Sequence, residues 1–101
     1  MRFNVAVIVF VTISQPLFAD GIEQACVASE RANSDRQLCQ CIQKAADLTL
    51  SDRDQRLAAT FFENPHRSQE IRQSDSRRNE AFWERYKNFG ETAEALCSDI
   101  S

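Results

Sequence analysis

The sequence predicts a small all-α domain of four to five helices, stapled by disulfides, that follows a cleaved signal peptide. Glycine and proline are rare, with two of each in the whole chain, which favours helices. Four cysteines follow an N-terminal segment with the properties of an export signal: Cys26, Cys39, Cys41 and Cys97. Because compartments outside the cytoplasm are oxidising, we expect these cysteines to form two disulfides.

Residues 1–19 have the composition of a signal peptide. A basic residue near the N-terminus is followed by an apolar run from Phe3 to Ile13. This run is shorter than the roughly 20 residues that a membrane span needs, so we expect a cleaved signal rather than an anchor. Asp20 stands where a lipoprotein would carry its lipidated cysteine. We therefore expect a soluble mature protein in which residues 20–101 form a single domain.

Apolar residues at helical spacing predict three helices in the first part of the mature chain. The first is expected over about residues 21–31 and the second over about residues 35–49. A short polar turn precedes the second helix, and Asn33 or Ser34 can cap it. The third covers about residues 51–63, with a serine N-cap at its start.

Two further helices are expected toward the end of the chain. A proline after Asn64 suits the first turn of a helix, so a short helix capped by Asn64 is predicted over about residues 65–73. Its one large apolar residue is Ile71, and we expect it to be the most mobile element. The last helix covers about residues 77–97 and continues through Gly90, with a break there as the alternative. Its apolar stripe consists of Phe82, Tyr86, Phe89, Ala93, Leu96 and Cys97.

Cys39 and Cys41 lie on opposite flanks of the second helix, since two residues turn about 200° around a helix axis. One flank can meet Cys26 and the other Cys97, which makes the second helix the centre of the domain. A bond between Cys39 and Cys41 is disfavoured, because the helix holds their Cβ atoms apart. Of the two remaining pairings, we slightly favour Cys26–Cys41 with Cys39–Cys97 over Cys26–Cys39 with Cys41–Cys97.

The alternative use of the cysteines is a metal site. Its ligands would be Cys39, Cys41 and Cys97, with His66 as a candidate fourth ligand. A helical Cys-x-Cys pair directs its sulfurs apart, and the sequence contains no Cys-x-x-Cys motif. We therefore expect no metal, no cofactor and no thioredoxin-like redox centre. The sequence also shows no recognisable nucleophile with a base, so we do not expect an enzyme.

Four residues form a candidate patch for a partner or ligand. His66, Arg67 and Arg72 belong to the weakly held fourth helix, and Trp83 lies about 100° off the apolar stripe of the last helix. Aromatic residues and arginine are the usual anchors of protein interfaces. The alternative interpretation is a tryptophan at the edge of the core beside solvated arginines.

The charge pattern excludes some classes of partner. The formal net charge is −3, and removal of the signal would take away Arg2 and make the chain more acidic. Basic and acidic residues are mixed along the chain, without a block of like charge. We therefore expect no nucleic-acid partner and no membrane insertion after signal cleavage.

Five short motifs carry a resemblance to a family of proteins. They are LCQCIQ at residues 38–43, DQR at 54–56, FF at 61–62, QSD at 73–75 and NEAFWERY at 79–86. These motifs resemble a family of short exported alphaproteobacterial proteins of uncharacterised function, some of which are labelled "arginine transporter". One short apolar segment cannot form a path for a solute across a membrane. The resemblance implies a bacterial origin and a periplasmic or secreted location, and it transfers no catalytic or ligand-binding residue.

Together these features predict a non-catalytic binding or interaction protein of the cell envelope, with another envelope protein as its partner. One alternative is a periplasmic stress chaperone that exposes apolar surface when its many carboxylates are protonated. Another is an accessory protein that binds a solute such as an amino acid. The sequence leaves open the partner and the oligomeric state.

Overall fold

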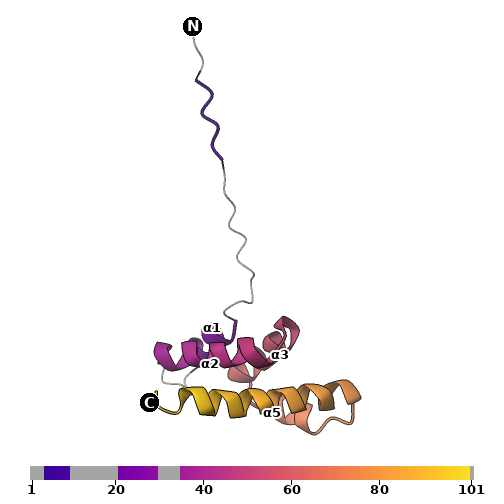
Figure 1. Cartoon of the computed structure of the whole chain (residues 1–101). Coiled ribbons are helices and arrows are strands. Elements are labelled where there is room, and N and C mark those ends of the chain that lie inside the picture. The colour runs from indigo at the N-terminus through magenta and orange to yellow at the C-terminus, as the bar shows by residue number, and fades with distance from the viewer. Residues whose placement is uncertain (1–3, 10–20, 30–34, 101) are drawn as a thin grey trace.

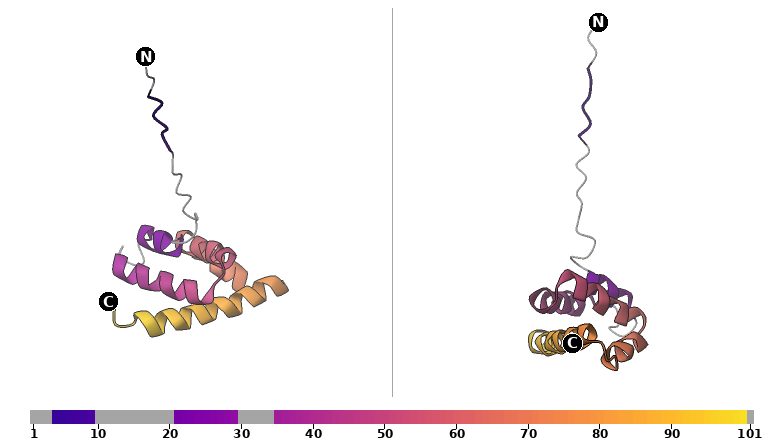
Figure 2. Two further views of the ribbon diagram at one scale, coloured as in Figure 1. Left: turned by 45° about the horizontal axis from the view of Figure 1, so that its top comes forward. Right: turned by 90° about the vertical axis from the view of Figure 1, so that its right-hand side faces the viewer.

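The computed structural model describes residues 4–9, 21–29 and 35–100. Within these ranges it contains five helices and no strand, which confirms the predicted all-α fold class. The helices are α1 (Gly21–Ala28), α2 (Arg36–Thr49), α3 (Asp52–Glu63), α4 (His66–Arg72) and α5 (Arg77–Cys97). The left view of Figure 2 shows α2 between α1 and α5, and α1 also packs against α3. Among the described parts of the chain, no helix has the length and hydropathy that a membrane span requires.

Residues 4–9, within the predicted signal, adopt no helix or strand and extend away from the helices (Figure 1). The side chains of Val5, Val7, Ile8 and Val9 are 71 to 81% exposed. The predicted cleavage site lies outside the described residues. No described residue of the predicted signal belongs to the buried core cluster, so the core of the helical domain does not depend on residues 4–9.

Side-chain caps define the starts of α2 and α3. Ser51 caps α3 as predicted, and its hydroxyl accepts a hydrogen bond from a first-turn backbone N–H at 3.2 Å. The N-cap of α2 is Asp35, whose carboxylate accepts from the N–H of Leu38 at 3.2 Å. The predicted caps of this helix, Asn33 and Ser34, lie outside the described residues. A carboxylate at this position also interacts favourably with the positive end of the helix dipole.

The short helix α4 starts without the predicted cap. Asn64 is the C-cap of α3, and its backbone N–H donates to the carbonyl of Thr60 at 2.9 Å. Pro65 occupies the N-cap position of α4 and offers no side-chain hydrogen bond. The prediction that Asn64 caps α4 was therefore wrong, because α3 ends at this residue. As expected, Ile71 is the buried residue of α4.

Helix α5 runs without a break from Arg77 to Cys97, so Gly90 lies inside it as predicted. Phe82, Phe89 and Cys97 are buried, but Leu96 is half exposed, although the sequence placed it in the apolar stripe. Neighbouring residues in a helix differ by about 100° in direction. Because Cys97 is directed at its partner in α2, Leu96 is turned toward the edge of the contact between the two helices.

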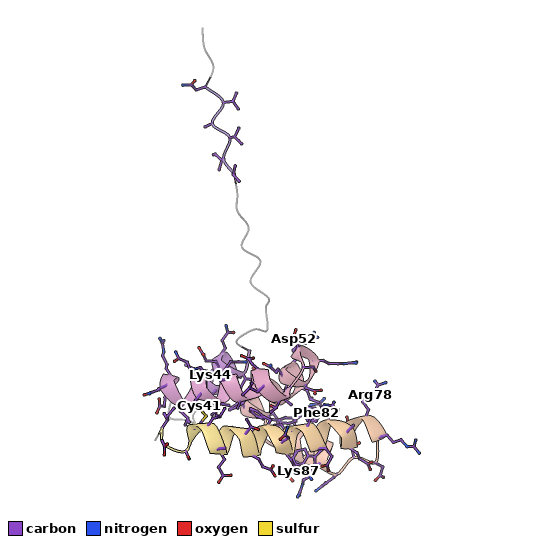
Figure 3. The ribbon with its side chains drawn as sticks, in the orientation of Figure 1. Cys41, Lys44, Asp52, Arg78, Phe82 and Lys87 are labelled. Atoms are coloured by element: carbon purple, nitrogen blue, oxygen red, sulfur yellow. A yellow bond between two sulfur atoms is a disulfide. The ribbon has the colours of Figure 1, made fainter. Side chains whose placement is uncertain are left out.

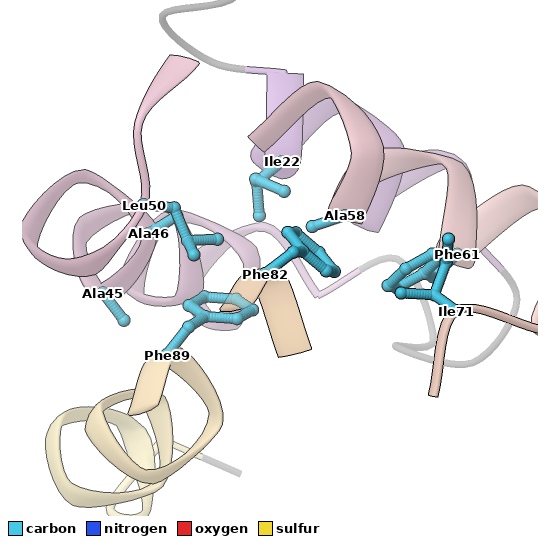
Figure 4. Close-up of a cluster of buried hydrophobic side chains, with 9 residues drawn as sticks. All are labelled: Ile22, Ala45, Ala46, Leu50, Ala58, Phe61, Ile71, Phe82 and Phe89. Carbon is cyan, nitrogen blue, oxygen red and sulfur yellow. The ribbon is translucent and has the colours of Figure 1, made fainter. Parts of the chain in front are cut away.

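The core lies where α5 meets α2 and α3. In Figure 4, Phe89 points from α5 toward Ala45, Ala46 and Leu50 at the α2 side. The ring of Phe61 on α3 packs edge-on against that of Phe82 on α5, with 6.0 Å between ring centroids. The buried cluster consists of Ile22, Ala45, Ala46, Leu50, Ala58, Phe61, Ile71, Phe82 and Phe89.

The structure pairs Cys26 with Cys39 and Cys41 with Cys97, with Cα–Cα distances of 5.6 and 5.8 Å. All four cysteines form disulfides, as predicted, and α2 is the helix linked on both sides. The favoured pairing of Cys26–Cys41 with Cys39–Cys97 was wrong. We refer to α1, α2 and α5 below as the disulfide-linked helices.

The register of α2 explains this pairing. Gln43 lies one turn after Cys39 on the same flank of α2, and its side-chain oxygen accepts the backbone N–H of Glu23 in α1 at 2.9 Å. This flank therefore faces α1. Ala45 lies one turn after Cys41, on the flank that meets Phe89 of α5 in Figure 4. Each cysteine bonds to the helix that its own flank contacts.

Candidate functional site

The buried polar side chains between α2 and α3 satisfy one another. The side-chain amide of Gln43 donates to Asp47 and to Gln55, both at 2.9 Å. The amide of Gln55 donates to the backbone carbonyl of Leu50 at 3.2 Å. With the bond from α1 to Gln43, this network joins three helices. Its members are engaged with each other, so we interpret it as structural rather than as a binding site.

An ion pair joins the start of α3 to the middle of α5. The guanidinium of Arg85 donates two hydrogen bonds to the Asp54 carboxylate, at 2.6 and 3.1 Å. Asp54 is only 7% exposed, whereas the side chain of Arg85 reaches solvent. The hydrogen bond with Asp54 raises the pKa of Arg85, although burial acts in the opposite direction. Arg85 therefore stays charged, and the pair acts as a bidentate link between two helices.

The structure distributes the four residues of the predicted patch over two places. His66 and Arg67 each lie 3.8 Å from a carboxylate oxygen of Glu70 on the exposed side of α4, and Arg72 is exposed at the end of this helix. Trp83 is partly buried on α5, and its ring centroid lies 5.2 Å from that of Tyr86. In the part of the chain that the structure describes, no hydrogen bond, ion pair or ring contact joins Trp83 to the three α4 residues.

A small cavity lies between these two places. It has a volume of about 100 Å³ at the junction of α3, α4 and α5, and we call it the aromatic cavity. Tyr86, the ring partner of Trp83, forms one wall, and Pro65 and Ser68 flank His66 and Arg67 at the start of α4. Its lining consists of Phe61, Phe62, Pro65, Ser68 and Tyr86.

Sequence reasoning missed this cavity, although its signal was present. Phe61 and Phe62 are separated from the Asn-Pro break by one residue, Glu63, and Tyr86 lies on the strongest apolar stripe. Tyr86 was placed in the apolar stripe of the last helix, and Phe61 and Phe62 were noted as a motif. Phe61 does lie in the core, but the turn between α3 and α4 leaves space beside these rings. The ring of Phe61 packs edge-on against that of Tyr86, with 5.2 Å between ring centroids, and together the two rings form an aromatic wall of the cavity.

Three larger cavities among the described helices are also open to solvent. One, of about 350 Å³, lies between α1 and α2. A second, of about 390 Å³, lies between α1 and α3, where small residues such as Ala25 and Ala59 and polar residues such as Gln55 line it in equal numbers. The third, of about 420 Å³, lies between α2 and α5 beside Cys41, and we call it the Cys41 cavity. Its lining consists of Gln37, Gln40, Cys41, Lys44, Leu96 and Ile100. In Figure 3, Cys41 lies where α2 meets α5.

Surface carboxylates and the cysteines offer no further site in the described residues. Glu84 lies 3.0 Å from Lys87, which is directed away from α2 in Figure 3, so this carboxylate forms a surface ion pair. Within the described residues, no group of three histidine, cysteine or acidic side chains is arranged to hold a metal ion. The cysteines named as metal ligands, Cys39, Cys41 and Cys97, have their sulfurs in disulfides.

Comparisons with protein-family models, curated proteins and solved structures found no match for this chain. The resemblance to short exported proteins therefore stays a prediction from the sequence motifs. Any functional assignment has to rest on the surfaces described above.

Proposed function

We propose that this protein is an exported, non-catalytic binding protein of the cell envelope, and that the aromatic cavity receives a side chain of a protein partner. The observation that carries this proposal is the position of the cavity. It brings aromatic walls from α3 and α5 together with the start of α4, where the exposed His66 and Arg67 stand between the lining residues Pro65 and Ser68 in the sequence. Aromatic and arginine side chains around a small recess are typical of the centre of a protein interface.

The size of the cavity favours a protein partner over a small solute. Pockets that enclose small molecules have volumes of roughly 300–1,000 Å³. The aromatic cavity, at about 100 Å³, is smaller than that range. An apolar side chain of a partner would fill it and contact Phe61 and Tyr86, and the exposed Arg67, next to the lining residue Ser68 in the sequence, would be available for polar contacts around it.

The export part of the proposal rests on residues 1–19 and on the disulfides. The described part of this segment is exposed and apolar, and two disulfides are compatible with an oxidising compartment. We place the protein in the periplasm or outside the cell, with Asp20 as the first residue of the mature chain. Intact-mass measurement of the exported protein tests this, because an unprocessed Met1 or a lipid adduct would contradict it.

The binding part can be tested by filling the aromatic cavity. Ser68 lines the cavity from α4, so Ser68→Trp should occupy it, whereas Ser98→Trp places the same side chain at the exposed end of α5. We expect crosslinking of the wild-type protein to envelope proteins to give a defined adduct. Ser98→Trp should retain this adduct, and Ser68→Trp should reduce it at least about tenfold. An adduct unaffected by Ser68→Trp would contradict the proposed site, and no adduct above background would contradict the binding role.

A second candidate function, an acid-responsive chaperone, is favoured by the ion pair between Asp54 and Arg85. Loss of this pair would remove the two hydrogen bonds that link α3 to α5 and so loosen the aromatic cluster of these helices. Binding of an apolar dye and protection of a client on acidification would support it. An unchanged fold without client protection at low pH would exclude it.

A further inference from the structure

The two disulfides differ in their access to solvent. Cys26 and Cys39 are both 0% exposed, so their bond is fully enclosed. Cys41 and Cys97 are 8% and 6% exposed. In addition, Cys41 forms part of the wall of the Cys41 cavity, which is open to solvent. A molecule in that cavity could approach the second disulfide while the first stays covered.

We propose that the bond between Cys41 and Cys97 is a thiol–disulfide exchange site for a dithiol partner, with the sulfur of Cys41 as the atom attacked. An attacking thiolate must reach one sulfur of the pair directly. Cys41 lines the cavity and Cys97 does not, so the open approach leads to Cys41. Cys97 then leaves as the thiolate.

The surroundings of Cys41 suit an anionic nucleophile carried by a protein. Lys44 lines the same cavity and places a positive charge near the path of the incoming thiolate. Leu96 and Ile100 form the wall on the side of α5, and Leu96 is half exposed. These apolar side chains would contact the residues that flank the attacking cysteine of the partner. Leu96 does not pack in the core, and contact with such a partner would give its half-exposed side chain a role.

The exchange is balanced in atoms and electrons. One thiolate of the dithiol partner bonds to the sulfur of Cys41, the bond between Cys41 and Cys97 breaks, and Cys97 carries away the electron pair. The second thiolate of the partner then displaces Cys41. The partner ends as a disulfide, and Cys41 and Cys97 end as thiols after taking up two protons. In the reverse direction, an oxidised partner would form this bond during folding.

Reduction would open one end of the domain only. The bond joins residues 56 positions apart and fixes the last turn of α5 to α2. Phe82 and Phe89 still bury the middle of α5 in the core, and the bond between Cys26 and Cys39 still links α1 to α2. We therefore expect a folded chain with two accessible thiols.

Timed reduction of the folded, oxidised protein tests the proposal. Dithiothreitol is added under native conditions, samples are quenched with an alkylating reagent, and labelled cysteines are mapped by mass spectrometry. We expect Cys41 and Cys97 to be labelled at least about tenfold faster than Cys26 and Cys39, with helical content retained. Equal rates, the reverse order, or joint reduction accompanied by unfolding would overturn the proposal.

Two further measurements test the mechanism. A monothiol such as glutathione should give a mixed disulfide on Cys41 and a free thiol on Cys97, and an adduct on Cys97 would overturn the assigned direction of attack. Lys44→Gln should slow dithiothreitol reduction about two- to fivefold at low ionic strength, while Lys87→Gln, on the outer side of α5, should not. Equal rates in both variants would overturn the role of Lys44.

Discussion

The disulfide-linked helices and the middle of the chain are held together by different means. Helices α1, α2 and α5 are joined by two covalent bonds and by the packing of Phe89 against α2. Helix α3 contributes Ala58 and Phe61 to the core, and α4 contributes Ile71. The aromatic cavity lies at the boundary between these two regions, where α4 meets α3 and α5. The helices that are linked by disulfides and those that are held by packing and polar contacts thus meet at the proposed binding surface.

Removal of either disulfide should lower the free energy of unfolding by several kcal/mol, and by more for the bond between α2 and α5. The entropy of loop closure predicts a loss of about 4 kcal/mol for the bond that spans 56 positions and about 3 kcal/mol for the one that spans 13. Denaturant unfolding of Cys41→Ser/Cys97→Ser and Cys26→Ser/Cys39→Ser measures both values. A larger loss for the second variant would contradict the view that the α2–α5 bond is the main covalent constraint.

Truncation of Ile71 should act locally on α4. Ile71→Ala removes the buried apolar side chain of α4, and such a change costs about 2–4 kcal/mol when it affects a whole domain. Because α4 is short and has no other buried residue, we expect the loss to appear as faster amide exchange in α4, with little change in α2 and α5.

Phe89→Ala is the matched comparison for Ile71→Ala. Phe89 belongs to the packing of α5 against α2, so its truncation should lower the global free energy of unfolding by about 3–5 kcal/mol. Similar exchange patterns in the two variants would show that α4 and the disulfide-linked helices unfold as one unit.

Loss of the Asp54 carboxylate should weaken the link between α3 and α5. Asp54→Asn removes the negative charge from a pair with two hydrogen bonds, but Arg85 can turn toward solvent. We therefore expect a modest loss of about 1–2 kcal/mol in denaturant unfolding at neutral pH. Glu84→Gln removes the surface partner of Lys87 and should change stability by less than about 0.5 kcal/mol. Equal losses in the two variants would contradict a structural role for the Asp54 pair.

Replacement of Gly90 should produce the smallest effect, and it should be stabilising. Gly90 is a solvent-exposed residue in the middle of α5, and a Cβ there would meet no atom within 4 Å other than its chain neighbours and the backbone of its own helix. Gly90→Ala should therefore add about 0.5–1 kcal/mol to the free energy of unfolding, because alanine favours the helix. A destabilised variant would indicate that α5 is not continuous at this position.

Sequence reasoning was most reliable where a local signal defines the structure. The Asn-Pro break, the serine before α3 and the apolar stripe of α5 placed three helix boundaries, because caps and prolines act within one turn. The continuity of α5 through Gly90 followed from the phase of the stripe.

The disulfide pairing could not be predicted in the same way. Cys39 and Cys41 flank the apolar stripe of α2 almost symmetrically, and the sequence does not show which flank meets α1. The hydrogen bond from the backbone N–H of Glu23 to Gln43 shows which flank of α2 faces α1. The sequence alone does not reveal this bond, because a buried glutamine and a solvent-exposed one are written with the same letter. The aromatic cavity was missed for a similar reason, because its shape depends on how α4 turns back onto α3 and α5.

The central claim is that two disulfides link α1 and α5 to the two opposite flanks of α2. Peptide mapping of the exported protein without reduction tests it most directly. We expect a chain that begins at Asp20, with Cys26 bonded to Cys39 and Cys41 bonded to Cys97. Free thiols at Cys26 and Cys39, or a bond between Cys39 and Cys41, would contradict this account.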